Sequence, residues 1–518
     1  MGMLKSISLE NYKCFKDRTD IEIAPLTVFC GVNSSGKSSI LKSLLMLKQS
    51  YENDSSTQSL LLSGKYVDNG TFDDIVYHIN KSSIDKDAHF KISNSFLIRD
   101  TSDEKGRNLI KRQDIASFRE LKKIFYSTKD IKKVKAFKLS VIIDVLRPNE
   151  SDTKNSFEFY IESNIINSYK IDIELLDSEN NIIDTEKHFI NVHKDTESDK
   201  GWLLDWEGIP STKLPSTENK NYECVCYFSG LQIKNIYADN MRNYVRFALP
   251  NILAIFKISA FQCDGINFIA PLRQHPERRY ALGGNVNSVG VSGENMPVLL
   301  ASEYNKKKTD VIPPYFGNKS DIGEENLIWE IKRDEFGNLV KSWMDYLNLG
   351  DLSLSLYGTG GLIEIGINNH NIVDVGFGVS QALPIIVQGL YMTKDQSLLL
   401  EQPEIHLHPE MQLRMADFLI ALAKNEKNII VETHSDHIIN RIIKRAMENP
   451  TLVNGENPVV KIIFLDRDEE LKSTKIDIQI DKYKGVINGS RNFFTQFGSE
   501  TMNISRIGYE NYKREKDQ

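Results

Sequence analysis

Eight consecutive residues near the N-terminus, 31–38, read G-x-x-x-x-G-K-S. They lie between an apolar run expected to form a strand, 26–30, and a run expected to form a helix, 39–49. Glycines at both ends let successive backbone N–H groups point at a phosphate, Lys37 brings a positive charge to the β and γ oxygens, and the Ser38 hydroxyl can bind Mg²⁺. The flanking strand and helix favour this interpretation over an incidental glycine-rich turn. We therefore predict an ATP-binding loop that uses Gly31, Asn33, Ser34, Ser35, Gly36, Lys37, Ser38 and Ser39.

Two later apolar runs end in residues that suit the same chemistry. The run 397–400 leads to Glu401, which we expect to bind Mg²⁺ together with Ser38, because a phosphate-bound metal needs an acidic ligand. The run 428–431 leads through Glu432 to His434. Ligands bind at the carboxyl ends of strands in open α/β sheets. A single histidine is usually a satisfied core residue, but its place after the loop and the acid strand favours contact with the γ-phosphate.

These blocks, in this order, resemble the heads of ABC/SMC-type ATPases. The resemblance extends to the single-chain AAA-family ATPases of bacterial phage-defence operons, in particular the family of Septu ATPase subunits (PtuA). It implies an α/β P-loop NTPase head of ABC/SMC-like type with an inserted β-rich and helical subdomain. It also implies a homo-oligomer in which two heads enclose ATP, and a partner nuclease of HNH type, PtuB-like. Further matching stretches are 11–17 (NYKCFKD), 268–273 (FIAPLR), Tyr280, 293–294 (GE), 375–381 (VGFGVSQ), 401–409 (EQPEIHLHP), 432–437 (ETHSDH) and the tail 478–494.

The segment 376–381 stands where transporters carry L-S-G-G-Q. The resemblance implies that Gly378, Ser380 and Gln381 contact the nucleotide of the partner head. A serine hydroxyl before a helix N-terminus can bind a phosphate, because the unpaired N–H groups and the helix dipole favour an anion. The alternative is a helix cap with no ligand.

Gln402 occupies the position where ABC-type heads usually place the carboxylate that activates the attacking water. An amide cannot accept the proton, so general-base help worth typically ~10²–10⁴-fold is missing. Glu404 is the alternative base if its side chain turns inward. We therefore predict a slow, Mg²⁺-dependent ATPase with a long-lived ATP-bound state, and the catalytic candidates are Glu401, Gln402, Glu404 and His434.

The chain divides by composition into four predicted parts: 1–80 and 266–465 as the two halves of the head, 81–265 as an inserted subdomain, and 466–518 as a C-terminal extension. Alternation at 169–175 followed by a turn at 177–181 predicts an antiparallel hairpin. Helices are expected at 235–256, interrupted at Pro250, and at 325–347. No apolar run reaches the ~18 residues that a membrane span needs, so we expect a cytoplasmic protein without membrane contact.

The formal net charge of −7 is unevenly distributed. Between Lys105 and Lys138 there are twelve Lys and Arg against three acids, so this segment carries +9 and the remainder −16. Such a segment can contact a phosphate backbone, which makes a nucleic-acid partner possible. The alternatives are a solvated helix face or a docking site for an acidic partner.

Two functions remain in competition, and a third is weaker. The first is an ATP-gated regulator of an effector in anti-phage defence, and the second is an SMC/RecF-like DNA-repair ATPase that acts directly on DNA. The third, an OLD-like ATPase nuclease, would use Asp466 and Asp468. The segment 466–471 is explained more simply as a hairpin turn.

Overall fold

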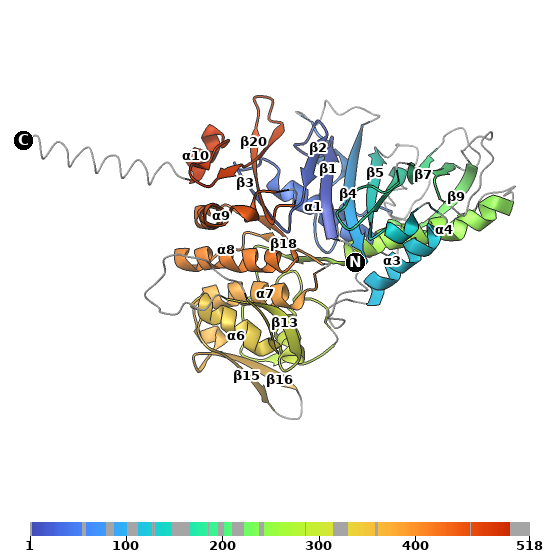
Figure 1. Ribbon diagram of the computed structural model, residues 1–518. Helices are drawn as coiled ribbons and strands as arrows, with labels where there is room; N and C mark the ends of the chain where they lie inside the picture. Colours follow the sequence, from blue (N-terminus) through green and yellow to red (C-terminus); the bar gives the residue numbers. More distant parts are fainter. Residues whose placement is uncertain are drawn as a thin grey trace, which may run out of the picture. The chain divides into compact units, whose positions relative to one another are not determined.

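The computed structural model describes residues 3–53, 59–78, 88–100, 112–126, 128, 130–147, 166–184, 186–194, 201–209, 222–237, 243–284, 286–313, 330–357, 361–394, 396–455 and 457–497. The chain forms two compact units (Figure 1). The first comprises Met1–Ile23, Ser38–Ile266 and Thr393–Ser397, and the second comprises Ala24–Lys37, Asn267–Met392 and Leu398–Gln518. The predicted N-terminal half, 1–80, is therefore shared between the two units.

The first unit is built on a nine-stranded sheet in the order β10-β9-β8-β7-β6-β5-β4-β1-β2, and all its neighbouring strands are antiparallel. Buried residues alternate with more exposed ones along β6 and β7, as in a sheet packed on one face. These two strands form the hairpin predicted around 169–181, which is confirmed. The strands are β1 (Met3–Glu10), β2 (Thr19–Glu22), β4 (His89–Arg99), β5 (Ala136–Leu146), β6 (Ile166–Leu176), β7 (His188–Lys194), β8 (Trp202–Glu207), β9 (Tyr222–Ser229) and β10 (Gln232–Tyr237).

The helices of this unit are α2 (Phe72–Ile75), α3 (Arg112–Ile124), the short η2 (Ile131–Lys133) and α4 (Asn243–Asp264); α1 (Lys37–Tyr51) begins in the second unit and continues here. The predicted helix 235–256 is wrong at its start, because Asn235 to Tyr237 pair with β9 as part of β10. Pro250 lies inside α4 and does not end it. Apolar residues beyond the proline, Ile252 and Phe256 among them, are buried, and this packing sustains the helix.

The second unit contains a six-stranded sheet in the order β11-β18-β19-β3-β20-β21. Strand β3 pairs in parallel with both β19 and β20, and β21 closes the edge in antiparallel pairing. Almost every residue of β3, β18 and β19 is buried, as expected for parallel strands covered on both faces. The three predicted strands of the site are confirmed. The bounds are β3 (Leu26–Gly31), β11 (Ile266–Ile269), β18 (Ser397–Glu401), β19 (Asn428–Glu432), β20 (Val460–Arg467) and β21 (Ser473–Asp477).

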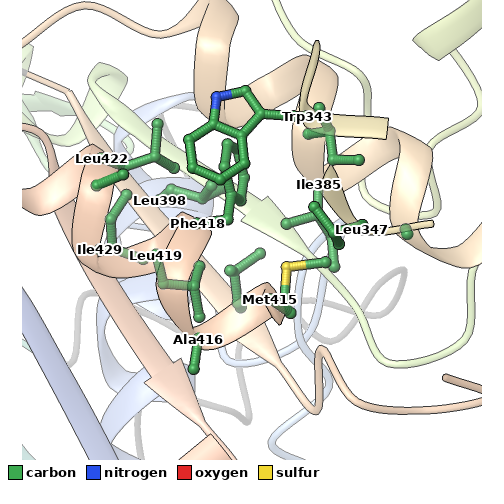
Figure 2. Close-up of a cluster of buried hydrophobic side chains, with 14 of the residues drawn as sticks. Trp343, Leu347, Ile385, Leu398, Met415, Ala416, Phe418, Leu419, Leu422 and Ile429 are labelled. Atoms are coloured by element: carbon green, nitrogen blue, oxygen red, sulfur yellow. The ribbon is translucent and has the colours of Figure 1, made fainter. Parts of the chain in front are cut away.

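Helices α6 (Phe336–Tyr346), α7 (Phe377–Tyr391) and α8 (Pro409–Lys424) form an apolar core with this sheet (Figure 2). Trp343 lies edge-on against Phe418 at 4.8 Å between ring centroids, and its indole N–H donates to the Val311 carbonyl at 2.9 Å. Leu398 and Ile429 contribute from the strands. This core fixes the strand ends that carry the candidate site.

Smaller elements complete the second unit. They are α5 (Met296–Glu303), α9 (Asp436–Glu448), η3 (Ile372–Asp374), η4 (Pro450–Leu452), α10 (Arg491–Phe497), β12 (Tyr280–Ala281), β15 (Leu352–Tyr357), β16 (Leu362–Ile367), β17 (His370–Asn371), β13 (Lys307–Ile312), β14 (Glu330–Glu335), β22 (Ile480–Asp481) and β23 (Gly485–Val486). The predicted helix 325–347 is wrong in its first half: 325–329 lie outside the described residues, and Glu330 to Glu335 form β14, which pairs with β13. None of the helices in the described part of the chain is long and apolar enough to span a membrane.

Candidate nucleotide-binding site

The predicted phosphate loop connects the end of β3 to the start of α1. Its backbone takes left-handed conformations at Gly31, Ser34 and Gly36, with φ of 141°, 61° and 100°. A Cβ added to Gly31 would lie 2.0 Å from the Leu465 carbonyl oxygen, so only glycine fits beside β20. The sequence pattern therefore produces the turn that it predicts.

Lys37 is buried in this loop, at 3% exposure. Its ammonium donates to the carbonyls of Gly31 at 3.0 Å and Val32 at 2.8 Å. Burial lowers the pKa of Lys37, and the nearby carboxylate of Glu432 opposes that shift. A buried cation held by two neutral carbonyls gains a strong partner when a phosphate arrives.

The remaining loop residues differ in exposure. Asn33 and Ser34 are exposed, whereas Ser35 is buried and its hydroxyl has no hydrogen-bond partner among the described residues. Ser38 and Ser39 lie in the first turn of α1, where helix N–H groups favour an anion. The left-handed glycine turns, the orphan hydroxyl of Ser35 and the buried Lys37 suit a phosphate chain.

The hairpin of β20 and β21 holds the outer side of the loop. Arg467 donates through Nε to the Ser34 carbonyl at 2.9 Å and through Nη2 to the same oxygen. Ser473 donates its hydroxyl to the Ser35 carbonyl at 2.6 Å. These bonds hold the two loop carbonyls, while the N–H groups of Val32 and Ser35 donate to the carbonyls of Leu465 and Val32.

The carboxylates of Asp466 and Asp468 accept hydrogen bonds from residues in and near this hairpin. Asp466 accepts from the Asn492 amide, at 3.0 Å to each carboxylate oxygen, and Asp468 accepts the backbone N–H groups of Glu470 and Lys472. The predicted turn 466–471 begins too early, because Asp466 and Arg467 still belong to β20, and the turn that leads to β21 is 468–472. Among the described residues, no group of three or more His, Cys, Asp or Glu could hold a metal ion.

The acid strand β18 ends at Glu401, and the chain turns at once. Gln402 has a φ of 46°, in the left-handed region, and its N–H donates to the Glu432 carbonyl at 2.8 Å. This bond joins the end of β18 to the end of β19. Glu401 and Gln402 are both partly exposed at the sheet edge where ligands bind in such folds.

Glu404 turns inward, but its carboxylate already has protein partners. Its Oε1 accepts the His434 N–H at 2.9 Å, and Thr433 lies close enough to affect its pKa. Burial raises the pKa of the carboxyl, while these contacts and the charge of Arg273 lower it. This geometry supports a role in holding the histidine loop, whereas the sequence suggested a role as base.

His434 lies in the loop between β19 and α9, half-buried. Its pKa is lowered first by burial and then by the charge of Lys37, so the imidazole is neutral at neutral pH. Ser435 caps α9 by accepting the Ile438 N–H at 3.1 Å, and this cap fixes the loop behind the histidine. A neutral imidazole next to the lysine can donate to a phosphate oxygen.

The predicted helix start at Ser380 is wrong. Helix α7 begins at Phe377 with Gly376 as its N-cap, so Ser380 lies one turn inside. Its buried hydroxyl donates to the Phe377 carbonyl at 2.8 Å, and Gln381 is also buried. The surface that remains for a ligand is the first turn, 376–378, where Gly378 is partly exposed.

The basic segment Lys105–Lys138 is described only in part. Lys105, Arg107, Lys111 and Lys129 lie outside the described residues, and nothing is described of the Arg112 side chain. Three of the others pair with acids: Lys123 with Glu120, Lys133 with Asp130, and Lys138 with Glu174, at 3.6, 3.1 and 3.0 Å. These pairs reduce the local positive charge, while Lys122 lies over the Phe118 ring at 5.4 Å.

Sequence reasoning gave no role to four residues that the structure brings into the site: Arg273, Glu432, Arg467 and Ser473. Arg273 lies in the matching stretch 268–273, and Arg467 lies between the two aspartates weighed as nuclease ligands. Their partners are mostly backbone carbonyls, which a sequence pattern does not reveal.

Comparison with known proteins identifies the family of the chain. A family model described as AAA ATPase domain matches residues 3–247 and 287–439, more than half of the chain. The chain therefore belongs to the AAA ATPase domain family. The second unit has the α/β fold of a P-loop ATPase domain, with parallel strands at its centre and the phosphate loop after β3. A search among curated proteins found no match.

Several solved structures are similar at low identity. An SMC head bound to the C-winged helix domain of ScpA shares 11% identity with a TM-score of 0.40, covering 93% of this chain and 98% of that chain. An SMC head domain from Thermotoga maritima shares 8% with a TM-score of 0.34, covering 92% and 100%. An Smc head domain with an extended coiled coil, bound to the C-terminal domain of ScpA derived from Pyrococcus furiosus, shares 12% with a TM-score of 0.38, covering 93% and 98%.

Proposed function

We propose that the protein is a slow, Mg²⁺-dependent ATPase whose ATP-bound state, formed between two copies, gates a separate effector. The observation that carries the proposal is the end of β18. An amide, Gln402, stands beside Glu401, and the nearby carboxylate of Glu404 is bonded to the His434 N–H. General-base help is therefore weak, and a bound ATP lasts.

Different residues would bind the phosphates and the Mg²⁺ ion of the nucleotide. Lys37 and the N–H groups of the loop bind the phosphates, and neutral His434 contacts the γ-phosphate. Ser38, in the first turn of α1, and Glu401, at the end of β18, are the residues that would hold Mg²⁺. The metal would neutralise phosphate charge. Gln402 would orient the attacking water without taking its proton.

The second copy would meet the nucleotide through the first turn of α7. Gly376 and Phe377 are exposed there, and the N–H groups of a helix start favour an anion. This assignment replaces the one that placed Ser380 against the partner's ATP, because the Ser380 hydroxyl is buried and bonded within its own helix.

The resemblance to Septu ATPase subunits supports anti-phage defence as the setting and an HNH-type nuclease as the effector. A DNA-repair ATPase is the second candidate, and the basic residues on α3 and η2 favour it. The neighbouring reading frame separates the two. An HNH nuclease or a reverse transcriptase beside the gene supports defence, and a recombination gene supports repair.

The substitution Gly376→Arg tests the proposal. A Cβ at Gly376 meets nothing within 4 Å and the residue has no left-handed φ, so the fold should tolerate the change. We expect normal ATP binding but no ATP-dependent association, measured by light scattering with ATP and EDTA or with ATP and Mg²⁺. Gly283→Arg, at another open glycine, is the matched control. Unchanged association in Gly376→Arg contradicts the two-copy model.

A further inference from the structure

Arg273 lies just after β11, and its guanidinium is buried against the end of the acid strand. Its side chain is only 5% exposed. Nη2 donates to the carbonyls of Glu401 at 3.2 Å and Gln402 at 3.4 Å. The two carbonyls lie on either side of the Gln402 Cα atom, so they help to fix the direction of the Gln402 side chain. The Nε and Nη1 groups of Arg273 are also buried and have no hydrogen-bond partner among the described residues.

The complementary group is the carboxylate of Glu404. Burial lowers the pKa of Arg273 to about 10, and the charge of the nearby Glu404 carboxylate partly opposes this shift. The Oε1 atom of Glu404 accepts the His434 N–H at 2.9 Å, while Oε2 is buried and has no partner in the described part of the chain. Two donors of Arg273 and one acceptor of Glu404 are thus buried without hydrogen-bond partners among the described residues, and the two side chains influence one another through their charges. Buried polar groups without partners cost stability, and a functional role is one reason why a protein keeps them.

We propose that Arg273 is a positioning residue for ATP hydrolysis, which holds the Glu401–Gln402 backbone directly and the His434 backbone through Glu404. This inference rests on the proposed ATPase function. Together the two charged side chains join the acid strand to the histidine loop, so that the amide of Gln402 and the imidazole of His434 keep a fixed relation. Neither Arg273 nor Glu404 needs to touch the nucleotide.

The planar guanidinium explains why arginine occupies this position. It presents donors on three nitrogens in one plane, so one edge can bind two carbonyls while the other faces a carboxylate. A lysine ammonium keeps the charge but cannot span both groups. The proposal therefore predicts partial function in Arg273→Lys and a larger loss in Arg273→Met.

The experiment measures ATP affinity and single-turnover hydrolysis separately in the full-length protein. Affinity is measured with a fluorescent ATP analogue in EDTA, and hydrolysis with ATP and Mg²⁺. We expect Arg273→Met and Glu404→Leu each to hydrolyse at least about tenfold more slowly, with affinities within about threefold of the parent. Glu404→Gln keeps an oxygen acceptor for the His434 N–H, so its rate should fall by no more than about threefold.

A double mutant identifies the coupling. If the two side chains act through one another, Arg273→Met combined with Glu404→Leu should lose no more rate than the worse single variant. Losses that multiply would overturn the inference, as would a parent-like rate in Arg273→Met. Abolished hydrolysis in Glu404→Gln at unchanged affinity would also overturn it, because Glu404 would then be the proton acceptor.

Thermal melting of each variant separates a general loss of fold from a positioning role. If Arg273→Met does not fold, Arg273→Lys and Glu404→Leu carry the test, with the same expected loss of rate at unchanged affinity. If the parent itself neither binds nor hydrolyses ATP, the proposed function fails. A parent that is active beside an equally active Arg273→Met contradicts only this inference.

Discussion

At the scale of single residues, the proposed slow hydrolysis depends on Gln402. It occupies a left-handed turn with its N–H on the Glu432 carbonyl, so its side chain starts from a fixed backbone. Gln402→Glu changes one nitrogen to oxygen and should preserve that backbone. We expect single-turnover hydrolysis to rise by up to ~10²-fold, because the new carboxylate can accept a proton from water. Quenched-flow or radiolabel assays would measure the rate.

Two controls accompany this prediction. Gln402→Asn keeps an amide and should not accelerate hydrolysis, and Lys37→Ala in the Gln402→Glu background should remove the gain if it arises at this site. An unchanged or lower rate in Gln402→Glu would show that residue 402 does not face the water, and the alignment of β18 with the ABC-type acid strand would be wrong.

Lys37 carries the prediction for nucleotide affinity. It is buried with its ammonium on two loop carbonyls, and charge-assisted hydrogen bonds contribute about 1.5–3 kcal/mol each. Lys37→Ala should therefore weaken ATP binding by about tenfold to more than a hundredfold, measured by isothermal titration calorimetry. Lys42→Ala, on the same helix, should bind like the parent. Equal affinity in Lys37→Ala and the parent is the result that would reject the loop as the phosphate site.

The sequence could predict the loop and the order of the acid and histidine strands, because each depends on local residue types at fixed spacing. It could not locate the start of α7, since Gly376 and Ser380 both suit a helix N-terminus and only tertiary packing selects one. Nor could it show that the Glu404 carboxylate bonds to the His434 N–H, a contact between residues thirty positions apart. Most partners of Arg273 and Arg467 are backbone oxygens, which leave no signature.

At the scale of elements, the hairpin of β20 and β21 supports the phosphate loop from outside. Arg467→Ala removes two donors to the Ser34 carbonyl. At about 0.5–1.5 kcal/mol for a typical hydrogen bond, ATP affinity should fall by about 3- to 10-fold, with the hydrolysis rate at saturation changed less. Equilibrium binding and single-turnover assays on the same preparations would separate the two quantities.

Lys482→Ala serves as the matched control, because Lys482 is an exposed cation of the C-terminal extension that contacts the Tyr483 ring instead of the loop. If Arg467→Ala lowers the saturated rate but leaves affinity unchanged, the hairpin acts on the chemistry and not on the loop.

The type of an element could be predicted where its apolar pattern was strong. The prediction failed where a polar segment forms a strand only because it pairs with a distant strand. The segment Glu330–Glu335 has five charged residues out of six and reads as the start of a helix, yet it forms β14 beside β13. Pairing with a partner strand supplies backbone hydrogen bonds that local propensity does not anticipate. In contrast, the apolar runs of β3, β18 and β19 are too hydrophobic to be exposed to water, so the sequence alone predicts that they are buried strands.

At the scale of the whole molecule, the uneven charge remains the basis for nucleic-acid contact. Replacing Lys122, Lys123, Lys132 and Lys133 by glutamine should weaken DNA or RNA binding. The slope of log affinity against log salt should fall by roughly 0.9 for each phosphate that the protein no longer neutralises. Lys123 and Lys133 already pair with acids, so the remaining two should contribute most. Fluorescence anisotropy over a salt series measures the slope.

The control replaces Lys306, Lys307, Lys332 and Lys482, exposed lysines of the second unit, by glutamine, which changes the net charge equally. A parent that binds no nucleic acid at low salt would end this interpretation, and the segment would be better explained as a docking surface for an acidic partner.

The position of β3 in its sheet affects how the chain folds during its synthesis on the ribosome. This wholly buried strand lies between β19 and β20, both of which are synthesised about 400 residues later. At 5–20 residues per second, β3 waits about 20–80 s for its partners. Strands β4 to β10 follow one another in both sequence and sheet, so they can pair as they leave the ribosome. We expect the apolar segment L-T-V-F-C-G to bind a ribosome-associated chaperone during that interval. Ribosome profiling of chaperone-bound nascent chains should then show occupancy that ends only when β19 and β20 emerge.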